Sequence, residues 1–300
     1  MRQADHGLLV LDKPSGMTSR AVVDRAQRWF PRRTRLGHTG TLDPLATGVL
    51  VLCVGSATRL TEYVQAMNKV YRTRLRLGVR SDTEDADGVV TEVAGAQPPT
   101  EGEVDRCLRA FEGIIEQVPP AFSAAKVSGQ RAYELARRGR EVELAARPVH
   151  IQRITRWAYA YPLLELEVHC GKGTYIRALA RDLGNRLGCG ALVEILRRER
   201  VGPFTAADAV VLDADAATAR AQLLPLEAAV CELPRVDVSP TQGEKLRHGQ
   251  SVSLTTLRLD QAALTADTEW AVFLESGPLI AVSRVDQRKG LLVPVKVLPT

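Results

Sequence analysis

The chain has 300 residues, of which 45% are hydrophobic and 25% charged, a composition typical of a globular protein with a sizeable core. No apolar run reaches the roughly 18–20 residues of a membrane helix, and the N-terminus lacks a signal-peptide layout, so we expect a cytoplasmic protein. The five cysteines include no C-x-x-C pair, which argues against a disulfide framework and a zinc site.

The net charge of +5 is unevenly distributed along the chain. Residues 231–300 are neutral, so the whole basic excess lies in residues 1–230. Arginines gather there in three clusters, at residues 25–35, 131–140 and 197–200. A single cluster is usually an ordinary solvated face, whereas three clusters favour a polyanionic partner such as a nucleic acid.

The first elements follow from hydrophobic periodicity. Residues 7–16 predict a strand ending in a Pro-Gly turn, and residues 18–30 predict a helix capped by Thr18 or Ser19. After a basic loop, the apolar run at residues 48–55 predicts a buried strand. Residues 68–80 alternate basic and apolar side chains, which indicates a half-exposed strand.

The second half of the chain continues this mixture. Residues 99–113 predict an amphipathic helix, and residues 163–190 predict a strand, a Gly-rich turn and a helix. Between them, residues 119–148 are basic and indicate an inserted, partly helical arm. The Ala-rich residues 205–230 indicate closing helices and a linker. From residue 233 short strands separated by Gly and Pro predict a small β-barrel. We therefore predict a mixed α/β protein.

Three motifs fail on inspection. Residues 81–88, "SDTEDADG", resemble a calcium loop, but Thr83 and Ala94 stand where its first and last acidic ligands belong. The "CGKGTY" segment at residues 170–175 lacks the spacing of a phosphate loop. The five histidines are scattered without metal-ligand spacing. The sequence thus predicts no metal and no nucleotide site.

One loop does point to chemistry. In "GHTGTLDPLATGVLVL", residues 37–52, a single carboxylate, Asp43, stands among small residues before the buried strand. Gly37 and Gly40 permit tight turns, and Pro44 restrains the residue before it. The loop should project the Asp43 carboxylate from the end of the strand. The alternative is an Asx turn in which Asp43 only caps its own backbone.

Two other segments weaken that alternative. Tyr71, among basic residues, offers a stacking surface for an extruded base, and Arg177 offers a partner that would hold a carboxylate ionised. Each also has an ordinary interpretation, because a strand Tyr usually belongs to the core and an Arg at a helix start is usually a surface charge.

Taken in order, several segments resemble the motifs of the TruB family of tRNA pseudouridine synthases, which modify uridine 55 in the T loop. The matching segments are residues 8–19, 35–50, 69–88, 170–184 and 196–204. The resemblance implies a pseudouridine synthase domain over residues 1–230, an α+β fold with a mixed, largely antiparallel sheet, flanking helices and the arm at 119–148. Residues 231–300 resemble the family's PUA-like module.

The resemblance also implies a reaction and a partner. The family breaks the uridine N1–C1′ bond, turns the flipped base and rejoins it through C5, without a cofactor. The partner would be the T stem-loop of tRNA, bound by a monomer that needs no membrane, protein partner or guide RNA. The arm resembles the stand-alone bacterial form rather than the guide-directed relatives. The alternative is a non-catalytic tRNA-binding or tRNA-folding protein with the same basic surface.

By the same resemblance, residues of this chain acquire roles. Asp43 would be the essential acid, Arg177 would pair with it and lower its pKa, and Tyr71 would lie against the flipped base and also serve the C5 proton transfer. Whether Asp43 attacks C1′, attacks C6 or takes a 2′ proton stays open. The expected substrate-binding residues are His38, Tyr175, Leu196, Lys69 and Lys13.

Overall fold

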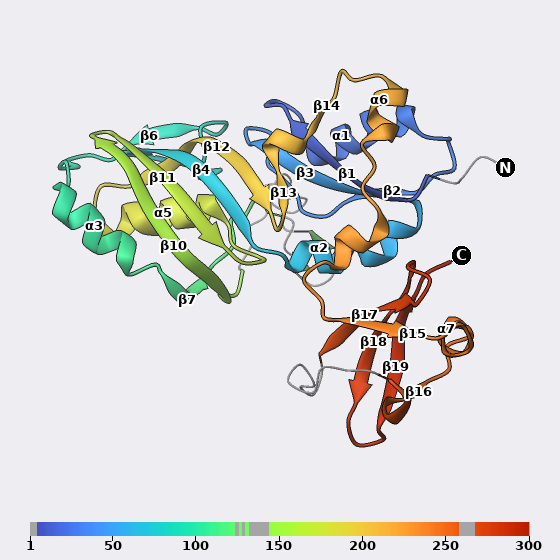
Figure 1. The fold of residues 1–300 in the computed structure, drawn as a ribbon. Helices are drawn as coiled ribbons and strands as arrows, with labels where there is room; N and C mark the ends of the chain where they lie inside the picture. Colours follow the sequence, from blue (N-terminus) through green and yellow to red (C-terminus); the bar gives the residue numbers. More distant parts are fainter. Residues whose placement is uncertain (1–4, 124–125, 128–129, 132–143, 258–267, 300) are drawn as a thin grey trace.

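The computed structural model describes residues 5–123, 126–127, 130–131, 144–257 and 268–299. A ten-stranded sheet forms the body of the molecule (Figure 1). Its main path runs through β14 (Val210–Val211), β1 (Gly7–Lys13), β3 (Thr47–Val54), β12 (Ala191–Val201), β4 (Lys69–Leu77), β11 (Leu163–Cys170), β10 (Arg147–Ala160) and β7 (Gly113–Gln117). Two further strands pair at its side, β2 (Leu36–His38) with β3 and β13 (Phe204–Thr205) with β12.

The sheet is mixed and largely antiparallel, as predicted. Only the β1–β14 and β3–β12 pairs run parallel among the described strands of this sheet. The β3–β12 pair joins its two halves, and Gly48 makes this approach possible. Its φ is +100°, and a Cβ there would lie 2.2 Å from the carbonyl oxygen of Arg198. A side chain at this position would force the halves apart.

The predicted N-terminal elements are present with one change. The helix α1 (Ser19–Ala26) begins at an N-cap Thr18, whose side chain accepts a hydrogen bond from the Ala21 backbone. It ends at Ala26 rather than near residue 30, and a 3-10 turn, η1 (Gln27–Trp29), follows. That tighter turn still brings Trp29 and Phe30 into the core, so the predicted apolar face is kept.

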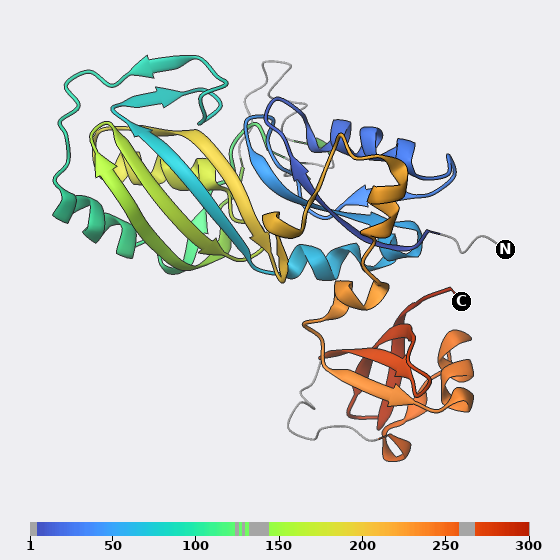
Figure 2. The ribbon, with the colours of Figure 1, turned by 45° about the horizontal axis from the view of Figure 1, so that its top comes forward.

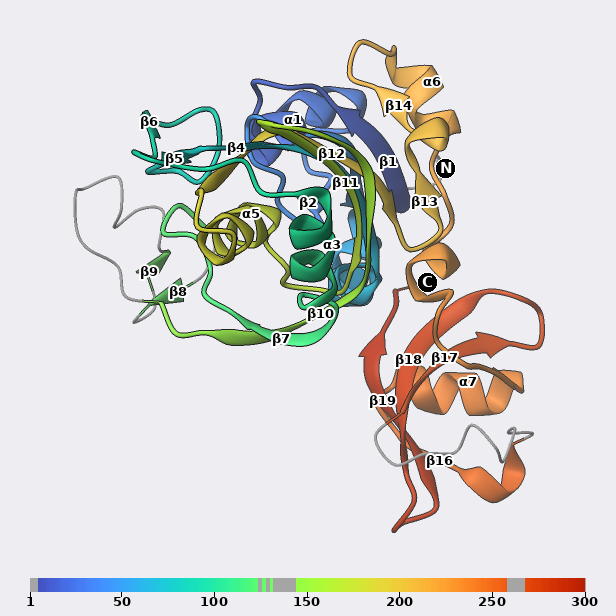
Figure 3. The ribbon, with the colours of Figure 1, turned by 90° about the vertical axis from the view of Figure 1, so that its left-hand side faces the viewer.

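The other half of the sheet curves around two helices (Figure 3). The helix α5 (Ile176–Arg186) fills the concave face, and α3 (Glu101–Arg109) lies beside it with the capping box of Thr100 and Glu103. Strand β4 buries alternate residues, as its sequence predicts. The ribbon of β5 (Val79–Ser81) and β6 (Val90–Glu92) brackets the acidic turn at residues 81–88.

Residues 205–230 differ in part from the predicted helices and linker. They contain η3 (Ala206–Asp208), α6 (Ala216–Ala221) and η4 (Leu226–Val230), but also the strand β14, which pairs with β1. A two-residue strand leaves no periodicity in the sequence. The pairing with β1 and the burial of Val210 create it.

The C-terminal residues form a second, curled sheet of five strands, consistent with the predicted PUA-like fold. Its order is β15 (Arg235–Val238), β17 (Glu269–Leu274), β18 (Leu279–Asp286), β19 (Leu291–Val297) and β16 (Val252–Ser253). The helix α7 (Pro240–Arg247), which the strand pattern did not predict, packs against it, and η5 (Leu254–Thr256) follows β16.

This C-terminal sheet packs against η2 (Gly55–Leu60) and α2 (Thr61–Ala66), which lie between the two sheets (Figure 2). Leu60 and Val64 share one apolar cluster with Phe273 and Leu279. The side chain of Lys296 also pairs with Glu62 at 3.0 Å. The second sheet therefore rests on the helix that leads into β4.

Much of the predicted arm lies outside the described residues, and so does the prediction that the arm is partly helical. Within residues 119–148, β8 (Lys126–Val127) pairs with β9 (Gln130–Arg131), and β10 begins at Arg147, slightly before the predicted end of the arm. All five cysteines are free thiols, in agreement with the sequence. No helix in the described parts of the chain has the length and apolarity needed to cross a membrane.

Candidate active site

A cavity of about 940 Å3 opens where the two halves of the large sheet meet. Its walls come from the loop before β3, from β4, from the acidic turn, from the start of α5 and from β12. Seven of the eight predicted site residues line it: His38, Asp43, Lys69, Tyr71, Tyr175, Arg177 and Leu196. Side chains up to 158 positions apart in sequence, His38 and Leu196, are therefore brought together in one cavity.

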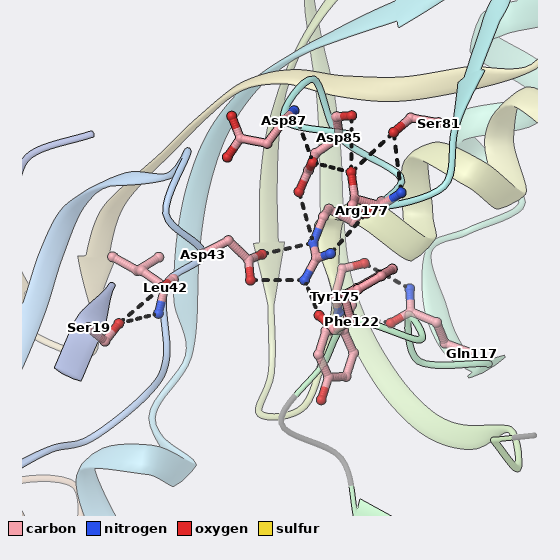
Figure 4. A network of polar contacts seen from close by, with 11 residues as sticks. Ser19, Leu42, Asp43, Ser81, Asp85, Asp87, Gln117, Phe122, Tyr175 and Arg177 are labelled. Atoms are coloured by element: carbon pink, nitrogen blue, oxygen red, sulfur yellow. Dashed lines mark hydrogen bonds and ion pairs between the residues drawn. The ribbon is translucent and has the colours of Figure 1, made fainter. Parts of the chain in front are cut away.

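The Asp43 carboxylate is held by Arg177 through two parallel hydrogen bonds (Figure 4). Arg177 donates from Nε to Oδ2 at 2.8 Å and from Nη2 to Oδ1 at 2.9 Å. The Arg177 side chain is 5% exposed, whereas that of Asp43 is 31% exposed. The guanidinium is thus buried behind the carboxylate, which keeps a face open to the cavity. The fork geometry fixes the direction of the carboxylate as well as its charge.

Three further groups complete the surroundings of Arg177. Nη1 donates to the Thr83 carbonyl at 2.9 Å, and Nη2 donates to the Phe122 carbonyl at 2.8 Å. The Asp85 carboxylate, itself nearly buried, lies 3.6 Å from Nε. The acidic turn that failed as a calcium loop therefore supplies a second carboxylate to Arg177. No cluster of metal-ligating side chains occurs among the residues that the structure describes.

The start of α5 is clamped by a buried amide. Gln117, 1% exposed, donates to the Tyr175 carbonyl at 3.2 Å and accepts from the Tyr175 backbone N–H at 2.8 Å. These two hydrogen bonds take the place of a backbone–backbone pair. They also give a partner to an N–H group at the helix N-terminus, where N–H groups lack partners within the helix. The clamp fixes the position of Tyr175, and of Arg177 in the first turn of the helix.

The loop carrying Asp43 is held from the other side. Ser19, at the start of α1, accepts from the Leu42 N–H at 2.8 Å and donates to the Leu42 carbonyl at 3.0 Å. The Lys13 ammonium donates to the carbonyls of Met17 at 2.6 Å and Pro44 at 3.2 Å. It also donates to Pro14 at 2.9 Å.

Lys13 corrects one expectation. We predicted a substrate contact, but its side chain is fully buried beneath the loop and does not line the cavity. Burial lowers the pKa of Lys13 to about 8, and the nearby Asp43 carboxylate opposes that change. The Lys13 ammonium is hydrogen-bonded to buried backbone carbonyls. Lys13 therefore supports the Asp43 loop and does not line the cavity.

The pKa of Asp43 also differs from the expectation. Burial raises the pKa of this carboxyl above its ordinary value, and the neighbouring Arg177 lowers it without offsetting the full effect. Asp85 acts in the same direction as burial. We had expected Arg177 to reverse the effect of burial. A second carboxylate on the same guanidinium explains part of the difference, because Arg177 is shared.

Another part of the cavity wall is cationic. Lys69 is 8% exposed and donates to the Gln65 carbonyl at 2.5 Å, and burial lowers its pKa to about 8. Tyr71, also 8% exposed, lies beside it on β4. Arg198, which is 2% exposed, reaches the cavity from β12. The cavity thus has a carboxylate wall around Asp43 and a cationic wall around Tyr71.

Sequence models of known families match most of the chain. The model of the TruB family pseudouridylate synthase N-terminal domain matches residues 28–176, and that of the tRNA pseudouridylate synthase B C-terminal domain matches residues 177–231. The chain belongs to the TruB family. The family predicted from the sequence motifs is therefore confirmed.

Individual relatives agree with this membership. The tRNA pseudouridine synthase B of Mycobacterium sp. (strain KMS) is 44% identical over 290 residues, covering 95% of this chain and 97% of the relative. The protein of the same name from Syntrophobacter fumaroxidans is 46% identical over 250 residues, 81% of each chain.

Solved structures show the same fold. A chain of a Cbf5-Nop10-Gar1 complex superposes with a TM-score of 0.75 at 25% identity, covering 94% of this chain and 78% of that one. A chain of an H/ACA RNP bound to a substrate RNA superposes with a TM-score of 0.74 at 23% identity, over 98% and 85% of the two chains. These likenesses support the mixed sheet and the curled C-terminal sheet.

Within this TruB-family site, sequence reasoning overlooked two side chains. Asp85 was dismissed with the failed calcium loop, and Arg198 was counted only as part of a basic cluster. Strand alternation offered a signal for Arg198, because consecutive residues of β12 point to opposite faces and Arg197 pairs with the half-exposed Asp12. Nothing local distinguishes Asp85 from the other acids of its turn.

Proposed function

We propose that this TruB-family protein is a tRNA pseudouridine synthase that converts uridine 55 in the T loop to pseudouridine. One observation carries the proposal: the Asp43 carboxylate, held by the bidentate Arg177 pair, lines the same cavity as Tyr71. A fixed carboxylate suits a reaction that builds positive charge on the ribose C1′. The close relatives that carry the name tRNA pseudouridine synthase B support the same substrate class.

The target uridine would be flipped out of its loop into the cavity, at a cost of a few kcal/mol. Tyr71 would lie against the flipped base, where stacking returns roughly 1–3 kcal/mol. Asp43 would then stabilise or trap C1′ while the N1–C1′ bond breaks and the base turns.

The remaining cavity residues would hold the RNA around that uridine. His38 would fill the stacking space left by flipped nucleotides, and Tyr175 and Leu196 would line the base pocket. Lys69 and the arginine clusters, apart from the buried Arg198, would contact phosphates. These contacts predict binding of the tRNA T stem-loop that weakens steeply with salt, because each phosphate contact releases counterions.

The organisation of the chain follows from this function. We propose a catalytic domain over residues 1–230, with its RNA-binding arm at 119–148, and a PUA-like domain over residues 231–300 that strengthens tRNA binding. The protein would act in the cytoplasm as a monomer, without a cofactor, guide RNA or protein partner. The likeness of the arm sequence to the stand-alone bacterial form supports independence from a guide.

The deciding experiment is to incubate the pure protein with an unmodified tRNA transcript and to map pseudouridine. We expect one pseudouridine at position 55 without added guide RNA or metal, and none with Asp43→Asn. A matched control is Asp24→Asn, which alters an exposed carboxylate on α1. Tight tRNA binding without any pseudouridine would favour the alternative, a tRNA-binding protein that does not modify RNA.

A further inference from the structure

Arg198 is a buried cation without a buried anion beside it. Its Nε donates to the Val49 carbonyl at 2.7 Å, and its Nη2 donates to the Gly40 carbonyl at 3.0 Å. In the described parts of the chain it forms no ion pair with a carboxylate. Carbonyl dipoles orient a guanidinium but leave its net charge in place. The positive charge is therefore available to whatever lies in front of the third nitrogen.

The group in front of that nitrogen is the Tyr71 phenol. Arg198 Nη1 lies 3.5 Å from the Tyr71 Oη, and the two residues are cross-strand neighbours of the β4–β12 pair. Burial raises the pKa of Tyr71, as do the Cys170 thiol from β11 and Asp43, whereas Arg198 lowers it. Among the groups facing the phenol, Arg198 thus has the largest effect in favour of its ionised form.

Resting on the proposed function, we propose that Arg198 is a positioning residue that stabilises the Tyr71 phenolate while Tyr71 relays a proton from C5 to N1 of the uracil. Such a relay matches the net reaction, because pseudouridine carries a proton on N1 and has lost the one on C5. A buried phenol without a nearby cation would be a poor carrier of that negative charge.

The relay balances in two steps. When the N1–C1′ bond breaks, its electron pair stays on the base, and the Tyr71 hydroxyl gives its proton to N1, leaving the phenolate beside Arg198. After the C5–C1′ bond forms, the phenolate takes the proton from C5, and the C–H electron pair restores the C5=C6 double bond. Tyr71 ends as it began, and no outside acid, base or oxidant is required.

The first test measures ionisation without turnover. A fluorinated tyrosine at position 71, whose phenol is more acidic, brings the titration into an accessible pH range. In this background Arg198→Met should raise the pKa of the phenol by about one unit or more. The matched control Arg74→Met removes a guanidinium from β4 that pairs with the half-exposed Glu165, and should leave the titration unchanged. An unchanged titration in the Arg198 variant would overturn the proposal.

The second test measures the chemical step in single turnovers at saturating enzyme. Arg198→Met should slow it about 10- to 100-fold and enlarge the isotope effect with 5-deuterated uridine, while tRNA affinity stays within about threefold. The fluorinated tyrosine should restore part of the lost rate. If Arg198→Met misfolds, Arg198→Gln provides the test, because it keeps amide donors while removing the charge.

The outcomes separate this proposal from the broader one. A loss of tRNA affinity with an unchanged single-turnover rate would make Arg198 a phosphate contact and overturn the proposal. A slower rate that neither the isotope nor the fluorinated tyrosine alters would make its role purely structural. A wild-type protein that forms no pseudouridine would refute the proposed function itself, whereas the titration would still report on Arg198 and Tyr71.

Discussion

Arg177 and Arg198 are two buried arginines that line one cavity, and they differ in what surrounds them. Arg177 is 4% exposed and meets the carboxylates of Asp43 and Asp85. Arg198 is 2% exposed and meets the carbonyls of Val49 and Gly40 and the phenol of Tyr71. The charge of Arg177 therefore faces carboxylates, whereas no carboxylate forms an ion pair with Arg198 in the described part of the chain.

This difference separates two uses of a buried cation. Around Arg177 two carboxylates face one guanidinium, so its main effect is to fix the direction of Asp43 and limit the rise in its pKa. Around Arg198 the carbonyl dipoles orient the guanidinium without cancelling its charge. A positive electrostatic potential therefore remains at the Tyr71 phenol. Breaking the first arrangement should strand a buried charge, whereas breaking the second should alter ionisation nearby.

The largest effect should come from Asp43→Asn, which removes the charge of the carboxylate that Arg177 holds. The shape of the side chain hardly changes. We expect no detectable pseudouridine in single-turnover assays, with tRNA affinity within about tenfold of wild type. Retention of about a tenth of the wild-type rate would show that Asp43 only shapes its loop.

Changes at Arg177 should come next. Arg177→Lys keeps the charge and loses the fork, so we expect a folded protein that has lost most of its activity. Arg177→Met should lose more, and should lower the free energy of unfolding by about 3–5 kcal/mol because it removes the guanidinium that pairs with Asp43 and Asp85.

The pH profile sharpens this second prediction. Asp43 acts as a carboxylate, and losing Arg177 raises its pKa further, so the remaining rate of Arg177→Met should rise with pH through a limb shifted to higher pH. An acid limb at the wild-type position would show that Arg177 does not control the ionisation of Asp43.

Lys13→Met should give a smaller effect, because Lys13 supports the Asp43 loop from below. Three carbonyls lose a donor, which should lower the free energy of unfolding by about 1–3 kcal/mol. This loss is offset in part because a buried charge is also removed.

The folded-state pKa of Lys13 is lowered to about 8 from 10.5, so the unfolded chain binds more protons between these pH values. Wild-type stability should therefore rise with pH across that window relative to Lys13→Met. Parallel denaturation profiles would contradict this.

The smallest effect should come from the ion pair of Lys296 with Glu62, which joins the C-terminal sheet to α2 at the surface. These side chains are 35% and 54% exposed. A double-mutant cycle with Lys296→Met and Glu62→Gln should give a coupling below about 1 kcal/mol. A coupling of about 3–5 kcal/mol, the loss of stability expected for Arg177→Met, would mean that burial does not distinguish the Lys296–Glu62 pair from the Arg177–Asp43 pair.

Several features of this protein follow from sequence alone. The alternation along β4, the Thr18 cap of α1 and the capping box of α3 are local, because each depends on residues within a few positions. The ordered motifs indicated the family, and the Asp43 loop and the start of α5 could be named as parts of one site. Even the pairing of Asp43 with Arg177 was predicted, by resemblance.

Other features exist only because distant segments fold together. Asp85 meets Arg177 across 92 positions, and Arg198 meets Tyr71 across the strand pairing of β4 and β12. Lys13, placed in the site by sequence, is enclosed by carbonyls of two loops. Charge clusters and hydrophobic periodicity in a sequence depend only on the residues that lie near one another along the chain. The burial of a charge, and whether a carboxylate or a carbonyl faces it, depend on neighbours that only the folded chain supplies.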